Sequence, residues 1–217
     1  MSAHVDALQP ERGPGVPLRL AYSSGRPRRL AGAGPIVPNA VVGTLMFLGA
    51  EAMFFGGLVS ALLVLRGGVE VWPPLDQPRL PIAVTALNTL VLLYSGYTMR
   101  RAADSARRDR LDALRQWLTA TAVLGTIFLV VQGAEWIRLV RYGLDATSST
   151  YGGTFYTLIG CHALHVLAGV IVLLAVLRGA IQGRYSSRTC GTVEAARLYW
   201  FFVVGVWPVL YVLVYLL

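Results

Sequence analysis

Five long apolar stretches dominate this sequence and constrain its fold more than any other feature. They cover about 38–65, 80–99, 116–134, 154–177 and 198–217, and only the first contains a formal charge, at Glu51. A helix needs roughly 20 apolar residues to span the hydrocarbon of a bilayer. Lipid offers no partner to an unpaired backbone group, so each stretch is expected to be a helix. The sequence therefore predicts an all-α, polytopic membrane protein with a bundle of five transmembrane helices.

With their polar flanks, the five helices are predicted at about 38–65, 80–101, 115–140, 152–178 and 195–217. Together they form one transmembrane domain over 38–217. Residues 1–37 hold five prolines and five arginines without hydrophobic periodicity, which predicts a poorly ordered cytoplasmic arm. Charged residues make up only 14% of the chain, against about 25% in soluble domains. Too little polar chain remains to cover these helices in a water-soluble fold.

The chain is basic, with a net charge of +8, and all 19 of its basic residues are arginines. A basic chain first suggests a nucleic-acid partner. However, fifteen arginines lie in the arm and in the loops after the second and fourth helices, and four lie in the other two loops. The positive-inside rule then predicts a cytoplasmic N-terminus and an external C-terminus. The membrane is expected to be a bacterial-type cytoplasmic (inner) membrane. Anionic lipid of the inner leaflet is a sufficient partner, and nucleic acid is not required.

Glu51 lies near the middle of the first span. An ionised carboxylate at this depth costs on the order of 3 kcal/mol or more, so the side chain is expected to face protein, a water pocket or a lipid headgroup. Two interpretations remain open. Glu51 is either a proton-linked or lipid-linked site, or an interhelical hydrogen-bonding group that fixes the packing.

His162 and His165 form an H-x-x-H pattern in the fourth span and share one helix face. A metal site would need at least one more ligand, which Glu51 could supply only if the first and fourth helices adjoin. Hydrogen bonds between helices are the favoured interpretation, and no metal site is predicted.

Other polar groups in the spans are interpreted as packing groups. Asn88 and Tyr199 are expected to hydrogen-bond between helices. Glu135 is placed at the outer membrane interface, beside the aromatic anchor Trp136. The pairs Gly56/Ser60 and Thr121/Gly125 have the small-x-x-x-small spacing that favours close helix contact. The sequence contains no phosphate-binding glycine motif and no nucleophile elbow, so no catalytic residue is predicted.

Several strings occur together in one order: AEAMFFGGL, LRGGVEVWPPL, ALNTLVLLYSGYTM, VVQGAEW, YGGTFYTLIGCHALHVLAG and VEAARLYWFFV. In that order they resemble subunit III of the haem–copper oxidases, the family of cytochrome c and quinol oxidases. The resemblance covers roughly residues 38 to 217 and matches the five-helix form of the subunit. The arm at 1–37 lies outside it.

The resemblance implies a non-catalytic core subunit of a proton-translocating terminal respiratory oxidase. In that family the subunit packs on subunit I, which reduces oxygen, and contacts other oxidase subunits. It binds no haem or copper of its own, holds phospholipids, supports proton uptake and prolongs the life of the active centre. The chain would thus be part of an enzyme without contributing catalytic residues.

The resemblance also implies roles for individual residues. Glu51 matches the intramembrane glutamate of the family, and Arg178 matches a position that binds lipid headgroups. Further matches are the H-x-x-H motif at His162 and His165, the glutamate of Q-x-x-E at Glu135, the outer W-P-P turn at Trp72, Pro73 and Pro74, and the packing or interface positions Tyr199 and Trp200.

The last span departs from the family pattern Y-W-H-F-V-D. Phe201 stands at the histidine position and Val204 at the aspartate position. Two alternatives therefore stay open beside subunit III of an oxidase. One is a subunit-III-like accessory subunit of another respiratory complex, such as nitric oxide reductase. The other is a small secondary transporter. It is less favoured because transporters often consist of two repeats, and five spans cannot form two equal halves.

Overall fold

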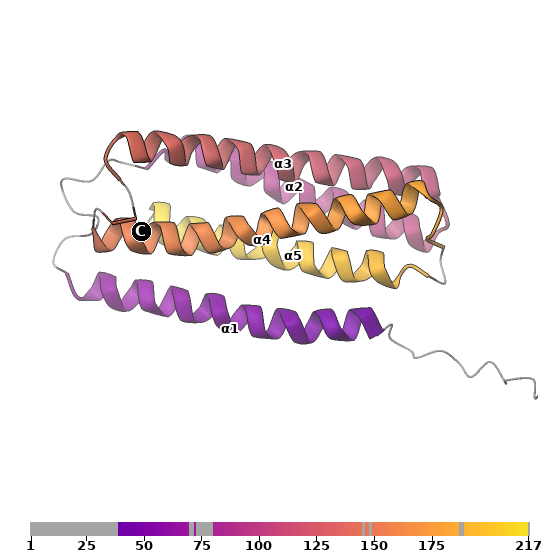
Figure 1. The fold of residues 1–217 in the computed structure, drawn as a ribbon, viewed down its shortest axis with the longest axis horizontal. Coiled ribbons are helices and arrows are strands. Elements are labelled where there is room, and N and C mark those ends of the chain that lie inside the picture. Colours follow the sequence, from indigo (N-terminus) through magenta and orange to yellow (C-terminus); the bar gives the residue numbers. More distant parts are fainter. Residues whose placement is uncertain are drawn as a thin grey trace, which may run out of the picture. The chain divides into compact units, whose positions relative to one another are not determined.

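The computed structural model describes residues 39–69, 72, 80–144, 146–147, 149–186 and 189–216. The predicted arm at 1–37 and the turn residues Pro73 and Pro74 lie outside this set. The described helices are α1 (Asn39–Gly67), α2 (Ile82–Arg107), α3 (Leu111–Arg141), α4 (Thr150–Ile181) and α5 (Gly191–Tyr211), which continues into the short π-helix η1 (Val212–Leu216) (Figure 1). Within the described residues, five helices are long and apolar enough to cross a membrane, which confirms the predicted all-α fold with five spans.

Helices α2 and α3 extend well beyond their uncharged runs. The sequence predicted a loop between about 101 and 115, whereas only residues 108–110 separate the two helices. Ala102, Ala103 and Ala106 explain the extension, because they are buried in the same core as Leu114 and Leu118. Small apolar residues thus keep the helices packed beyond the point where arginines begin.

Helices α2, α3, α4 and α5 enclose the core, and α1 lies against α5 and, over a smaller area, α4 (Figure 1). Trp200, Trp207, Phe128 and Phe155 are among the largest fully buried side chains. Helix α1 buries little: its only buried side chains are the three at Val41, Phe55 and Leu62. Many of its other apolar side chains are exposed, Met46 and Met53 among them.

Trp200 is the centre of the packing between α5 and the other helices. Its indole N–H donates to the hydroxyl of Ser95 on α2 at 3.1 Å. Its ring lies between two glycines, where an added Cβ would come within 2.6 Å of it at Gly125 and 2.8 Å at Gly169. The close contact predicted around Gly125 is therefore present. At Gly56 an added Cβ would meet nothing within 4 Å among the described residues, so that glycine makes no comparable contact.

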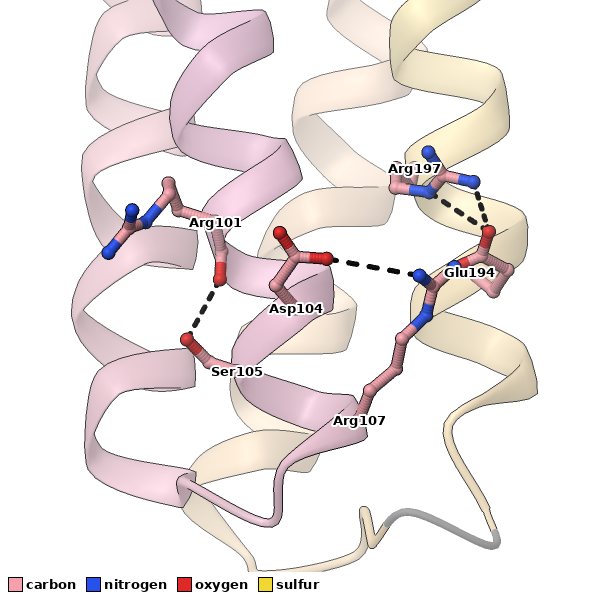
Figure 2. A network of polar contacts seen from close by, with 6 residues as sticks. All are labelled: Arg101, Asp104, Ser105, Arg107, Glu194 and Arg197. Carbon is pink, nitrogen blue, oxygen red and sulfur yellow. Dashed lines mark hydrogen bonds and ion pairs between the residues drawn. The ribbon is translucent and has the colours of Figure 1, made fainter.

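Arginines at one end of the bundle connect helices to one another. Glu194 of α5 accepts from Arg107 of α2 at 3.0 Å and also pairs with Arg197 one turn along its own helix (Figure 2). Arg115 of α3 donates to the carbonyl of Ala180 near the end of α4 at 3.1 Å. These contacts join the arginine-rich ends of four helices.

Candidate functional site

A carboxyl–imidazole pair inside the membrane span is the candidate functional site. The Oε2 atom of Glu51 lies 2.8 Å from Nε2 of His165 and links α1 to α4. The two side chains are 17% and 19% exposed, respectively. The structure thus brings together Glu51 and His165 out of the set Glu51, His162 and His165 that the sequence analysis considered for a proton-linked, lipid-linked or metal-binding role.

The hydrogen bonds of His165 determine where the proton of the pair can be. Nδ1 lies 2.7 Å from the carbonyl oxygen of Cys161, and a carbonyl can only accept, so Nδ1 carries a hydrogen. Nε2 then has two options. It accepts from a protonated Glu51, or it donates to an ionised Glu51 as part of an imidazolium. Both arrangements are neutral overall and contain one proton between the two residues, which avoids an isolated charge at membrane depth.

Aromatic side chains surround this pair. The ring of Phe55 lies 5.1 Å from that of His165, and Phe54 covers it from 6.3 Å. The hydroxyl of Tyr199 donates to the backbone carbonyl of His165 at 3.1 Å, which ties α5 to the same point of α4. The low-dielectric surroundings strengthen the hydrogen bond between Glu51 and His165.

His162 lies one turn away but has no part in this hydrogen bonding. Its side chain is buried, and neither ring nitrogen has a hydrogen-bond partner among the described residues. The ring stacks on Trp207 at 5.0 Å and meets the edges of Phe55 and Phe128. The prediction of a hydrogen-bonded residue is therefore wrong for His162, because its face of α4 points into an aromatic cluster. Within the described ranges, no three His, Cys, Asp or Glu side chains are grouped closely enough to hold a metal ion.

Apart from Tyr199, the residues interpreted as packing groups make their contacts elsewhere. The amide of Asn88 on α2 donates to the carbonyl of Phe128 on α3 at 3.0 Å. Glu135 is buried and accepts from Arg138 of its own helix at 2.8 Å. Trp72 packs edge-on against Tyr151.

Arg178 is exposed near the arginine-rich end of α4, more than three helical turns beyond His165 on the same helix. The structure does not bring it together with the Glu51–His165 pair. Sequence reasoning also missed a contact between Gln132 of α3 and the hydroxyl of Tyr215 in η1, at 3.0 Å. The Q-x-x-E string that contains Gln132 was the available signal, but only its glutamate was singled out.

The two positions that depart from the family pattern have different surroundings. The ring of Phe201 lies 5.1 Å below the guanidinium of Arg197 and lines an open cavity of about 410 Å³ between α1 and α5. Val204 is buried, and one of its methyl groups would lie 3.4 Å from a Cβ added at Gly96 on α2. Aromatic and aliphatic packing fills both positions.

Comparisons with known proteins bear on the whole transmembrane unit. The family model described as cytochrome c oxidase subunit III matches residues 35–217. The chain is 39% identical over 176 residues to the cytochrome c oxidase subunit 3 of Synechocystis sp., covering 81% of this chain and 74% of that protein. It is 35% identical over 178 residues to the protein of the same name from Thermostichus vulcanus, covering 82% and 87% of the two chains. A probable cytochrome c oxidase subunit 3 of Mycobacterium leprae is also 35% identical, over 182 residues, covering 82% and 88%.

Proposed function

Because this chain belongs to the cytochrome c oxidase subunit III family, we propose that it is the non-catalytic core subunit III of a terminal haem–copper oxidase in a bacterial cytoplasmic membrane. In this role it packs on subunit I and contacts other oxidase subunits. The weakly buried helix α1 is consistent with the proposal, since side chains such as Met53, 80% exposed, offer apolar surface to a neighbouring chain or to lipid.

The Glu51–His165 pair is the observation that connects this role to proton uptake. Oε2 of Glu51 and Nε2 of His165 lie 2.8 Å apart and share one proton. The proton can therefore move from one residue to the other without creating net charge. A group of this kind can exchange a proton with its surroundings at much lower cost than an isolated carboxylate in lipid. We assign the pair a supporting role in proton uptake and in the durability of the oxidase.

Phospholipid binding is the second part of the proposal. Arg178 is exposed at the end of α4 that lies on the arginine-rich side of the bundle. If the arginine-rich side faces the cytoplasm, as the positive-inside rule predicts, Arg178 lies at the level of anionic headgroups. A planar guanidinium suits a phosphate because it can donate two parallel hydrogen bonds.

We assign the haem and copper of the oxidase to its other subunits. Both ring nitrogens of His165 are engaged, one by Cys161 and one by Glu51. The nitrogens of His162 are enclosed by aromatic rings. Neither histidine is therefore arranged to ligate a metal.

Purification of the tagged full chain from its native membrane in a mild detergent tests the proposal. The expected result is co-purification with larger chains that carry haem and copper, together with oxygen-consuming activity. Removal of the chain should leave the initial rate of oxygen reduction largely intact and shorten the time before the enzyme inactivates. Recovery of the chain with no haem-bearing partner would contradict the proposal.

Phe201 and Val204 favour one alternative, a subunit-III-like accessory subunit of another respiratory complex. The family places polar residues at both positions, whereas here the ring of Phe201 lies against the guanidinium of Arg197 and Val204 is buried beside Gly96. The metal content of the purified assembly separates the two functions. A haem–copper oxidase contains copper at its oxygen-reducing centre, and a haem-bearing assembly without copper would favour the alternative.

A further inference from the structure

A small polar hollow lies where α2 turns into α3, separate from the Glu51–His165 pair. It has a volume of about 80 Å³ and is lined by Arg101, Asp104, Ser105, Arg108 and Arg110. The first four of these residues follow the i, i+3, i+4, i+7 spacing of a single helix face. Arg110 comes from the three-residue turn between the helices. We refer to this feature as the inner-turn hollow.

The inner-turn hollow has more positive charge than its own carboxylate can balance. Asp104 is the one acidic residue among its described lining residues, and it is already paired with Arg107 at 3.8 Å. The side chain of Arg101 extends away from Asp104 (Figure 2). Arg108 and Arg110 form no ion pair with any carboxylate in the described part of the chain. An anion that enters the hollow would therefore meet guanidinium groups with donors to offer.

The hydroxyl of Ser105 is not one of the available donors, because it donates to the carbonyl of Arg101 at 2.8 Å. Asp109 lies on the same turn with a φ of 55°, but it is not a lining residue. Its left-handed backbone makes the turn tight enough to bring Arg108 and Arg110 to the same hollow. Arginine side chains are thus the groups that would recognise a ligand here.

The depth of the hollow indicates which anion reaches it. The uncharged run of the second span ends at Met99, and Arg101 follows two residues later. The guanidinium of Arg101 lies 5.4 Å above the ring of Trp117 on α3. Tryptophans concentrate at the membrane interface, where headgroups lie. The phosphates that are most concentrated at this depth belong to lipids.

We propose that the inner-turn hollow binds the phosphate of an anionic phospholipid headgroup through Arg108 and Arg110, with Arg101 and Trp117 forming the membrane-facing side. Guanidinium groups bind phosphate through paired, charge-assisted hydrogen bonds. The hollow is at the α2–α3 turn and does not include Arg178, which is at the end of α4. The proposal depends on these residues and requires no contact with subunit I.

Native mass spectrometry of the full chain, purified with its natural partners, tests this site. The wild type is compared with the double variant Arg108→Gln/Arg110→Gln in the presence of phosphatidylglycerol or phosphatidylcholine. Loss of the direct hydrogen bonds from both guanidinium groups to the phosphate should weaken phosphatidylglycerol binding roughly 30-fold. The matched control is Arg100→Gln/Arg184→Gln, which removes the same charge from exposed positions at the same end of the bundle but outside the hollow. The control should stay within about twofold of the wild type.

Two results would overturn the site. Equal losses in the two double variants would show that diffuse surface charge, rather than the hollow, retains the lipid. Displacement of phosphatidylglycerol by inorganic phosphate at the same concentration would identify a site for a soluble phosphate instead. The same spectra record the partner chains, so absence of a haem protein would count against the proposed function and leave the headgroup site to be judged by its own result.

Discussion

Glu51 and His165 hold one proton between them, and this makes Glu51→Gln an informative substitution. The glutamine amide can still donate to Nε2 of a neutral His165, so the hydrogen bond remains while the exchangeable proton of the carboxyl is lost. We expect normal assembly and a change in thermal stability of less than about 1 kcal/mol. The number of turnovers before inactivation, or the rate of proton uptake, should fall. Both are measurable on the purified oxidase.

Glu51→Leu is the matched control for this substitution. It leaves Nε2 of His165 without its partner at 2.8 Å, which should cost about 1–3 kcal/mol in the unfolding free energy. If Glu51→Gln retains wild-type durability and proton uptake while Glu51→Leu is destabilised, the pair is a packing device and its proposed proton role fails.

His162 provides a separate prediction, because it is buried without a hydrogen-bond partner among the described residues. Phenylalanine is apolar and suits the aromatic cluster around Trp207. Since a buried polar group without a partner is unfavourable, His162→Phe should be neutral or raise the unfolding free energy by about 1 kcal/mol. His165→Phe should instead lower it by about 1–3 kcal/mol. Thermal unfolding of the two variants in one detergent compares them, and a strongly destabilised His162→Phe would indicate a polar contact at His162.

The sequence could identify Glu51 but not its partner. The free-energy cost of a carboxylate in lipid singles out Glu51 from the sequence alone. His162 and His165, however, share a helix face, and spacing alone treats them alike. Which of them reaches Glu51 depends on how α1 crosses α4, and which meets Trp207 depends on the position of α5. These are properties of the packed bundle that no single stretch encodes locally.

At the scale of helices, the contact of Trp200 with two glycines makes a prediction about packing. A methyl group at Gly125 would lie 2.6 Å from the ring, which is buried on all sides and cannot move aside easily. We expect Gly125→Ala to lower the unfolding free energy by about 1–3 kcal/mol through overpacking. Gly133→Ala, on the same helix, meets nothing within 4 Å and should be neutral or slightly stabilising. Similar melting temperatures for the two variants would show that Trp200 can be displaced.

The sequence predicted which stretches form helices more reliably than it predicted where those helices end. Uncharged runs predict spans because lipid excludes charge and unpaired backbone. The same rule ended the predicted second helix at about Arg101, although α2 continues to Arg107. The buried alanines at 102, 103 and 106 stabilise the additional turns of α2, and their burial depends on contact with α3. The ends of the spans are therefore set by helix packing, which hydropathy does not record.

For the molecule as a whole, the distribution of arginines predicts its orientation. Fifteen of the 19 lie on the side that contains the arm and the α2–α3 and α4–α5 connections. Because translocation of arginine-rich loops is disfavoured, that side should be cytoplasmic. Ala146 and Gln182 are exposed at opposite ends of α4 and allow a direct measurement.

In a background with Cys190→Ser, Ala146→Cys should react with a membrane-impermeant maleimide in intact spheroplasts. Gln182→Cys should react only in inverted membrane vesicles. Each variant serves as the control for the other, because both substitutions flank the same helix. The reverse pattern would place the fifteen arginines outside, and it would remove the inner-turn hollow and Arg178 from the anionic leaflet that the proposed lipid contacts require.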